Sequence, residues 1–194
     1  MKSHTYKLTA YPKDIVLRDG RKCVLKPMTV NDRDALAEFF HRLPAEDRFY
    51  FKDDVTDPRV IDKWIQDLNY DSTLPLLAWV DGRIAADGTL HRSRANTRRH
   101  VGKIRIAVAP DMRVCGLGTT ILQELANIAN ANGLERLYLE AIADKEAAAI
   151  KAAELVGFVR AGILPGHAKD LDGHPRDIIL LEMPLGKWLE WWGF

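Results

Sequence analysis

A turn midway along the chain combines residue types that together can hold a diphosphate. It lies in the stretch VAPDMRVCGLGTTILQELANIA, residues 108–129, between a short apolar run and an amphipathic helical pattern. Arg113, Gly116 and Gly118 stand in this turn. Glycine lets the backbone approach a ligand closely. The first N–H groups of a helix have no partner within it and can bind an anion together, and arginine adds planar, charged donors for phosphate oxygens. These features predict a diphosphate-binding turn.

Two common phosphate-binding motifs fit this turn poorly. A dinucleotide fingerprint would have a third glycine at position 121, where the chain has Ile121. A nucleotide P-loop would have a lysine and then a serine or threonine after its last glycine, but Thr119 directly follows Gly118. Short glycine motifs also recur by accident, so a strand-to-helix turn that needs glycine only for its own shape remains an alternative on this segment alone.

The composition is that of a globular domain with an apolar core. The chain has 194 residues, of which 47% are hydrophobic and 28% charged, and a formal net charge of +1, which gives no overall attraction to nucleic acid or anionic membranes. The N-terminus lacks the apolar segment of a signal peptide, and no stretch has the roughly 20 apolar residues of a membrane span. Cys23 and Cys115 make neither a disulfide framework nor a four-thiolate zinc site. We expect a cytoplasmic protein without a metal.

Turn and helix signals indicate a mixed α/β domain. Asp-Gly pairs at residues 19–20 and 81–82 separate apolar runs, which predicts tight hairpins with both turn residues at positive φ. Another pair, at residues 172–173, lies in what we expect to be a longer loop. Helical patterns and capping residues predict helices over residues 31–42, 57–68, 117–132 and 144–156. Strands are expected over residues 103–109, 135–141, 158–163 and 177–183. This order predicts one strand–helix–strand crossover around the glycine turn.

Over about residues 14–185 the chain resembles the GNAT acetyltransferases. RVCGLG is similar to the R/Q-x-x-G-x-G/A motif with which that family binds the pyrophosphate of acetyl-coenzyme A (acetyl-CoA). VLRDGRKCVLKPMTVNDRDALAEFFHRLPAEDRFYF resembles the first strand and helix of GNAT domains related to bacterial protein-lysine acetyltransferases. RLYLEAIADKEAAAIKAAELVGF, which ends in Gly157-Phe158, resembles the later strand and helix, and LPGHAKDLDGHPRDIILLEMPL the closing hairpin. The matches follow the family's order and spacing.

The resemblance implies a fold and a coenzyme site. The fold would be a mixed α/β GNAT fold, with a largely antiparallel sheet, a parallel, splayed central pair and flanking helices. Pantetheine would enter the splay beside Ile106, Ala107 and Val108, and a backbone N–H near Val108 would polarise the thioester carbonyl. The pyrophosphate would be held by the segment of the glycine turn that comprises Arg113, Val114, Cys115, Gly116, Leu117, Gly118 and Thr119. Acetyl-CoA is therefore the expected co-substrate.

The residues that many family members use for proton transfer are altered in this chain. A glutamate base on the strand before the glycine turn aligns with Lys103, and a tyrosine acid on the helix before Gly-Phe aligns with Ala153. An asparagine often found near the start of that helix is matched by Glu146. An amine must lose a proton before or as it attacks a thioester, so an active enzyme would need another base.

Glu140 is the candidate catalytic residue. It ends the strand RLYLE, on the splayed side if the alignment holds, and it equally fits a strand-end charge. Asp177 and His174, at the closing hairpin, are further candidates, although a hydrogen bond within the hairpin and a solvated loop position explain them as well.

Three classes of function follow from these features. The first is an N-acetyltransferase that moves acetyl from acetyl-CoA to a primary amine, of a protein or a small molecule, in a ternary complex. The second is a coenzyme-A-binding module without catalysis, motivated by Lys103 and Ala153. The third is an RNA-associated protein that uses the basic segment HRSRANTRRH, residues 91–100. That segment lacks interleaved aromatic residues and joins two strands, which favours a solvated hairpin tip, so neither nucleic acid nor a membrane is an expected partner.

The resemblance also sets the expected boundaries. Residues 1–13 would form an N-terminal tail, residues 14–185 the GNAT domain and residues 186–194 a tryptophan-rich C-terminal extension. The sequence PLGKWLEWWGF has apolar residues at helical spacing. This pattern predicts a buried face that packs on the domain or on a second subunit of a homodimer.

Overall fold

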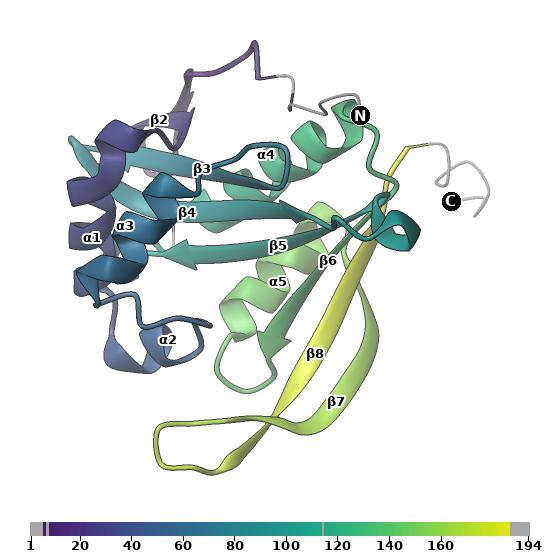
Figure 1. Cartoon of the computed structure of the whole chain (residues 1–194). Coiled ribbons are helices and arrows are strands. Elements are labelled where there is room, and N and C mark those ends of the chain that lie inside the picture. The colour runs from purple at the N-terminus through teal and green to yellow at the C-terminus, as the bar shows by residue number, and fades with distance from the viewer. Residues whose placement is uncertain (1–5, 7, 114, 187–194) are drawn as a thin grey trace.

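One mixed sheet runs through the described part of the chain, which in this computed structural model is residue 6, residues 8–113 and residues 115–186 (Figure 1). Its eight strands lie in the order β1-β2-β3-β4-β5-β6-β8-β7. They are β1 (Lys13–Val16), β2 (Lys22–Pro27), β3 (Thr73–Val80), β4 (Arg83–Arg92), β5 (Val101–Val108), β6 (Arg136–Ile142), β7 (Val159–Lys169) and β8 (Pro175–Pro184).

Helices cover both faces of this sheet (Figure 1). α1 and α3 pack on one face, and α4 and α5 on the other. The helices are α1 (Arg33–Arg42), α2 (Ala45–Phe49), α3 (Pro58–Gln66), α4 (Leu117–Ala131) and α5 (Ala147–Val156), with short 3-10 turns η1 (Val30–Asp32), η2 (Asn96–Arg98) and η3 (Pro110–Met112). No helix in this part of the chain is long and apolar enough to cross a membrane.

The central pair of strands, β5 and β6, gives the sheet its one parallel pairing among the described strands. The two strands pair only from Val101 to Lys103 on β5, opposite Arg136 to Tyr138 on β6. β5 continues to Val108 and β6 to Ile142 without further pairing between them. The expected mixed α/β fold, with a largely antiparallel sheet and a splayed parallel pair, is therefore confirmed.

The two hairpins that were expected to share one turn type differ. In the β3–β4 turn, Asp81 and Gly82 both have positive φ, 51° and 75°, as expected. In the β1–β2 turn Gly20 has positive φ, at 86°, but Asp19 does not. The prediction that both residues of that pair have positive φ was therefore wrong. The β1–β2 connection is longer, closed by the Leu17 N–H on the Arg21 carbonyl at 2.9 Å, and a single left-handed residue suffices to reverse it.

The closing hairpin is also longer and tighter than expected. β7 and β8 extend to Lys169 and Pro175, so only residues 170–174 connect them, where we expected a longer loop. The Asp170 carboxylate holds this turn, because it accepts the backbone N–H groups of Asp172 and His174 at 3.0 and 2.9 Å. These side-chain hydrogen bonds add to the backbone ones at the tip, where the Asp170 N–H donates to the His174 carbonyl at 3.0 Å.

α2 is a helix that the sequence analysis did not anticipate. It has five residues, none of them buried, and follows Pro44. A helix this short shows no apolar periodicity, which is the signal that reveals longer helices. Its position depends on tertiary contacts, among them the Arg105 guanidinium on β5, which donates to the backbone carbonyl of Tyr50 at 2.9 Å.

The described part of the expected N-terminal tail packs on the domain. Tyr6 is 3% exposed. The Tyr11 hydroxyl donates to Glu124 of α4 at 2.7 Å, and Lys13 forms an ion pair with the same carboxylate at 2.6 Å. The domain therefore begins before residue 14. Of the expected C-terminal extension only Gly186 is among the described residues, so the prediction of a buried tryptophan face falls outside them.

Gly88 marks a close approach between α4 and β4. Asp87 and Gly88 form an Asp-Gly pair that lies within β4 rather than in a turn. A Cβ at Gly88 would lie 2.2 Å from Cγ2 of Ile121 and 3.1 Å from Cδ1 of Leu125. We expect Gly88→Ala to destabilise the fold by about 1–3 kcal/mol through overpacking, which lowers Tm by roughly 2–4 °C per kcal/mol in a chain of this size.

Gly162→Ala, also within a strand, is the matched control for this melting experiment. A Cβ there would meet only Cδ1 of Leu180, at an ordinary 3.9 Å. Its melting temperature should stay close to that of the wild type. A Gly88→Ala protein that melts with the wild type would contradict the close packing of α4 on β4.

Candidate functional site

The divergence of β5 from β6 opens into a cleft of about 920 Å³. β5 and β6 form its inner walls, and the glycine turn with the start of α4 closes one end. α2, the tip of the β7–β8 hairpin and α5 contribute further residues to its lining. A splayed pair of strands thus supplies a concave site without any additional domain.

The glycine turn presents backbone N–H groups at this end of the cleft. Gly116, with φ of +82°, caps α4 in the left-handed region, where a side chain would be strained and would meet Nε of Arg18 at 2.9 Å. The first hydrogen bond of the helix runs from the Thr120 N–H to the Gly116 carbonyl, at 3.1 Å. The N–H groups of Leu117, Gly118 and Thr119 precede it and have no partner within the helix. This end of the cleft is suited to an anion.

Gly118 has a different role from Gly116. It lies in the first turn of α4 and has no positive φ. A Cβ there would make ordinary contacts of 3.7 Å with Val108 and 3.9 Å with Ile106, both in the cleft wall. The fold itself therefore does not require glycine at this position. The missing side chain leaves room beside β5 for a ligand.

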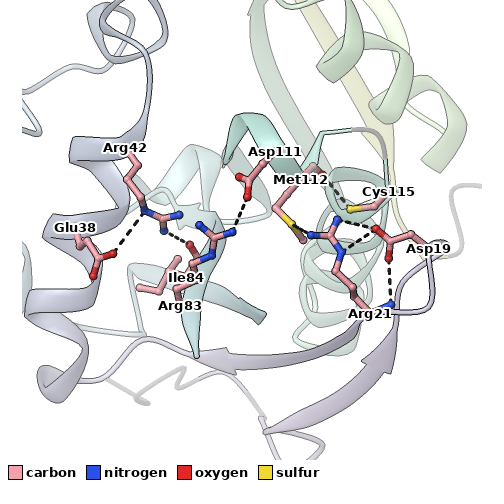
Figure 2. A network of polar contacts seen from close by, with 9 residues as sticks. All are labelled: Asp19, Arg21, Glu38, Arg42, Arg83, Ile84, Asp111, Met112 and Cys115. Atoms are coloured by element: carbon pink, nitrogen blue, oxygen red, sulfur yellow. Dashed lines mark hydrogen bonds and ion pairs between the residues drawn. The ribbon is translucent and has the colours of Figure 1, made fainter. Parts of the chain in front are cut away.

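The other residues expected at the coenzyme site divide into two groups. Ile106, Ala107, Val108, Arg113, Gly116, Gly118 and Thr119 line the cleft. The side chains of Cys115 and Leu117 are buried in the core, 4% and 0% exposed, so these two residues offer the cleft only their backbone. The Cys115 thiol donates to the Met112 carbonyl at 3.0 Å (Figure 2). Val114 lies outside the described residues.

Arg113 reaches across the cleft rather than over the start of α4. Its guanidinium forms an ion pair with Asp47 of α2. Its Nε also donates to the backbone carbonyl of Val108 at 3.2 Å, at the end of β5. The positive charge expected at the pyrophosphate is thus paired with a carboxylate of α2, another part of the cleft lining.

Lys103 and Glu140 meet across the point where the strands diverge. Nζ of Lys103 lies 2.7 Å from Oε2 of Glu140, and it also lies 5.5 Å from the centroid of the Tyr138 ring. Both Lys103 and Glu140 line the cleft. Glu140 is two residues from the end of β6, which runs to Ile142, so the expectation that it ends the strand was wrong. Glu140 nevertheless places a carboxylate beside Lys103, the position that aligns with the family's glutamate.

The other sequence candidates for proton transfer lie away from the cleft. Asp177 accepts the backbone N–H of Gly166 at 2.9 Å and holds the closing hairpin. His174 is exposed, 3.6 Å from Asp170. Asp170, Asp172 and His174 have potential ligand atoms within 4.8 Å of one another, but Asp170 is already paired with Arg176 at 2.6 Å. Ala153 is fully buried and does not reach the cleft.

Two titratable residues near the cleft, Asp87 and His91, were not singled out from the sequence. Asp87 lies opposite Ala107 and His91 opposite Lys103 in the β4–β5 pairing. Burial raises the pKa of Asp87 to about 6. Burial, with Arg105 and Lys103 nearby, lowers the pKa of His91 to about 4. No local pattern marks these residues, because their neighbours come from another strand.

Glu146, at the start of α5, is a half-buried acid on the cleft wall. Its carboxylate accepts the backbone N–H of Ile142 at 2.6 Å. Burial raises its pKa, the hydrogen bond and Arg105 lower it, and Asp47 adds a smaller upward contribution. A carboxyl with a raised pKa in a cleft is a candidate for proton transfer.

The buried charge of Asp87 should make stability depend on pH. Its pKa in the folded protein, about 6, exceeds the ordinary value of 3.8, so the folded state holds this proton more tightly than the unfolded state. Stability should therefore fall as pH rises from about 4 to about 6 and stay level above. Asp87→Asn keeps an acceptor for the Thr89 hydroxyl, 3.1 Å away, and should stabilise the fold by about 1–3 kcal/mol at pH 7.5.

Denaturant unfolding of wild type and Asp87→Asn between pH 4 and pH 7.5 measures this effect. The stability difference should shrink toward pH 4, where the wild-type carboxyl is protonated in the folded state and about half protonated in the unfolded state. A difference that is constant with pH would show that the buried charge is not its source.

Several known proteins with similar sequences or structures are named as acetyltransferases. An acetyltransferase of Pseudomonas aeruginosa is 27% identical over 127 residues, which are 63% of this chain and 67% of that protein. The GNAT domain of S. lividans PAT superposes with a TM-score of 0.74 at 19% identity, covering 92% of this chain and 99% of that domain. The yncA protein of Salmonella typhimurium, solved with acetyl-CoA, has a TM-score of 0.72 at 18% identity, covering 85% and 95%.

The similar solved structures support the fold of this chain. The match of its sequence to a family model supports the family. Residues 36–166 match the model of the acetyltransferase (GNAT) family, and this span includes β3 to β6, the glycine turn and α5. The splayed strands, the uncapped N–H groups and the glycine turn between them therefore belong to a member of the GNAT acetyltransferase family.

Proposed function

We propose that this acetyltransferase moves the acetyl group of acetyl-CoA to a primary amine by direct attack in a ternary complex. The observation that carries the proposal is the cleft itself. One end offers backbone N–H groups suited to an anion, and Glu140 stands at the point where β5 and β6 diverge. An anionic, amide-containing coenzyme and a reacting amine need these two features together.

The coenzyme would bind through backbone groups. The N–H groups of Leu117, Gly118 and Thr119 would hold its pyrophosphate, aided by the helix dipole. Beyond Lys103 the edge of β5 has no strand partner on the side of β6, so the amides of pantetheine could pair with it as an added strand would. A backbone N–H near Val108 would then polarise the thioester carbonyl as negative charge develops on its oxygen.

Glu140 would remove the proton from the acceptor amine, directly or through a water. The amine nitrogen then attacks the thioester carbon, the carbon–sulfur bond breaks, and the coenzyme A thiolate leaves. The ammonium formed on attack gives its extra proton to the thiolate or to water, which yields the amide. A simple thiol has a pKa of about 8.5, so the thiolate is a tolerable leaving group without a tyrosine acid. The Lys103 ammonium lies beside Glu140, with Nζ 2.7 Å from Oε2, and so holds the carboxylate at the point where the strands diverge.

The acceptor that we favour is the amine of a protein lysine or N-terminus, with a small-molecule amine as the next candidate. The test measures coenzyme A thiol release from acetyl-CoA with lysine peptides, peptides with a free N-terminus and small amines. Release that depends on one amine class identifies the acceptor. Tight acetyl-CoA binding without release for any amine would favour the second candidate, a non-catalytic coenzyme-binding module, which the Lys103–Glu140 ion pair and the buried Ala153 motivate.

A further inference from the structure

Arg113 and Asp47 join two elements that both contribute to the cleft. Arg113 belongs to the turn before α4, Asp47 belongs to α2, and both side chains line the cleft. Because Arg113 also donates to the Val108 carbonyl, its side chain extends from the glycine turn along the end of β5 to α2. It therefore crosses the region through which the coenzyme would pass.

The coenzyme and Asp47 would compete for the same guanidinium. The side chains of Arg113 and Asp47 are 41% and 37% exposed, and ion pairs as exposed as this contribute little to stability. A pyrophosphate carries more negative charge than one carboxylate and would lie beside the start of α4. Acetyl-CoA should therefore draw Arg113 away from Asp47.

The withdrawal of Arg113 would leave Asp47 without this partner on the cleft wall. Glu46, next to Asp47 on α2, also lines the cleft. Glu146 lies close enough to Asp47 for the Asp47 charge to contribute to its raised pKa, while Arg105 acts in the opposite direction. The Arg105 guanidinium donates a hydrogen bond to the Tyr50 carbonyl at 2.9 Å. Asp47, with Glu46 and Glu146 in the same cleft lining, would then be open to a cation.

We propose that Asp47 binds a second positively charged group of the acceptor, apart from the amine that is acetylated, and that Arg113 covers Asp47 until acetyl-CoA binds. This inference rests on the proposed function. It names the substrate class as amines that carry a further ammonium or guanidinium group, and it makes acetyl-CoA the first substrate to bind. The amine of a lysine in a basic peptide and the amine of a small diamine both meet this description.

Asp47→Asn tests both parts of the proposal, because it should strengthen the binding of acetyl-CoA and weaken the binding of the doubly charged acceptor. Removal of the competing carboxylate should tighten acetyl-CoA binding by about 2–5-fold in calorimetry. The KM for 1,4-diaminobutane should rise about 10-fold, while the KM for butylamine, which lacks the second charge, changes little. A lysine peptide flanked by arginines, compared with one flanked by alanines, shows whether the second charge belongs to a peptide or to a small amine.

Asp111→Asn is the matched control. Asp111 lies two residues before Arg113 and pairs with Arg83 at 2.6 Å (Figure 2), but it does not line the cleft. This variant should keep the wild-type acetyl-CoA affinity and the wild-type preference between diamine and monoamine.

The outcomes separate this inference from the proposed function. Wild-type protein that does not bind acetyl-CoA overturns the proposed function and this inference with it. Normal acetyl-CoA turnover, with an unchanged diamine-to-monoamine preference in Asp47→Asn, overturns the inference alone. An Asp47→Asn protein that loses acetyl-CoA affinity and melts at a lower temperature also overturns it, because Asp47 would then be a structural contact.

Discussion

Gly118→Asp is expected to weaken acetyl-CoA binding by about 100-fold or more. A carboxylate at this position would face the pyrophosphate, and like charges brought together in a cleft cost several kcal/mol, where about 1.4 kcal/mol is tenfold in affinity. The fold should tolerate the change, since a Cβ at Gly118 makes only contacts of 3.7 and 3.9 Å and an acidic residue near a helix N-terminus is favourable. Calorimetry with acetyl-CoA measures the affinity, and the melting temperature verifies the fold.

Gly118→Ala separates the charge from the added volume. Alanine is a better helix former than glycine, so this variant should be as stable as the wild type or more stable by up to about 1 kcal/mol, with a smaller loss of affinity than the aspartate variant. High salt should reduce the difference between the two variants, because it screens exposed charges. A folded Gly118→Asp protein with wild-type affinity would place the pyrophosphate elsewhere.

Glu140→Gln is expected to lower turnover by about 10²–10⁴-fold, the usual contribution of a general base. The amide keeps the shape of the side chain but cannot accept the proton of the acceptor amine. Acetyl-CoA affinity should change little, because Glu140 lies on β6, away from the N–H groups at the start of α4. The rate at saturating amine, measured across pH in wild type and variant, is the direct test.

Lys103→Ala and Glu146→Gln complete this experiment. Lys103 is a partner of Glu140 rather than a proposed base, so its loss should affect turnover much less. Glu146 lines the same cleft and has a raised pKa, so it is the residue to which catalysis would be reassigned if Glu140→Gln retained the full rate. Full loss in Glu140→Gln with a near-normal Glu146→Gln supports the assignment to Glu140.

The sequence by itself determined the elements whose causes are local. α4 was expected because an apolar period of 3.6 residues follows a glycine that can take positive φ and ends before Gly133, which does the same at 75°. The start of α3 was expected from Asp57 and Pro58, and the Asp57 side chain does accept the Arg59 N–H at 2.9 Å. The glycine turn could also be predicted from the sequence, because its glycines and the helix that follows are neighbours along the chain.

Only the tertiary structure decided which charges face one another in the cleft. Lys103 and Glu140 are separated by 37 residues, and Asp47 and Arg113 by 66. Their meeting depends on the point where β5 and β6 diverge and on the position of α2, a helix too short to have a pattern of its own. The raised pKa of Asp87 likewise depends on burial within the assembled fold. Ion pairing and desolvation are properties of distance in space, and separation along the chain does not encode them.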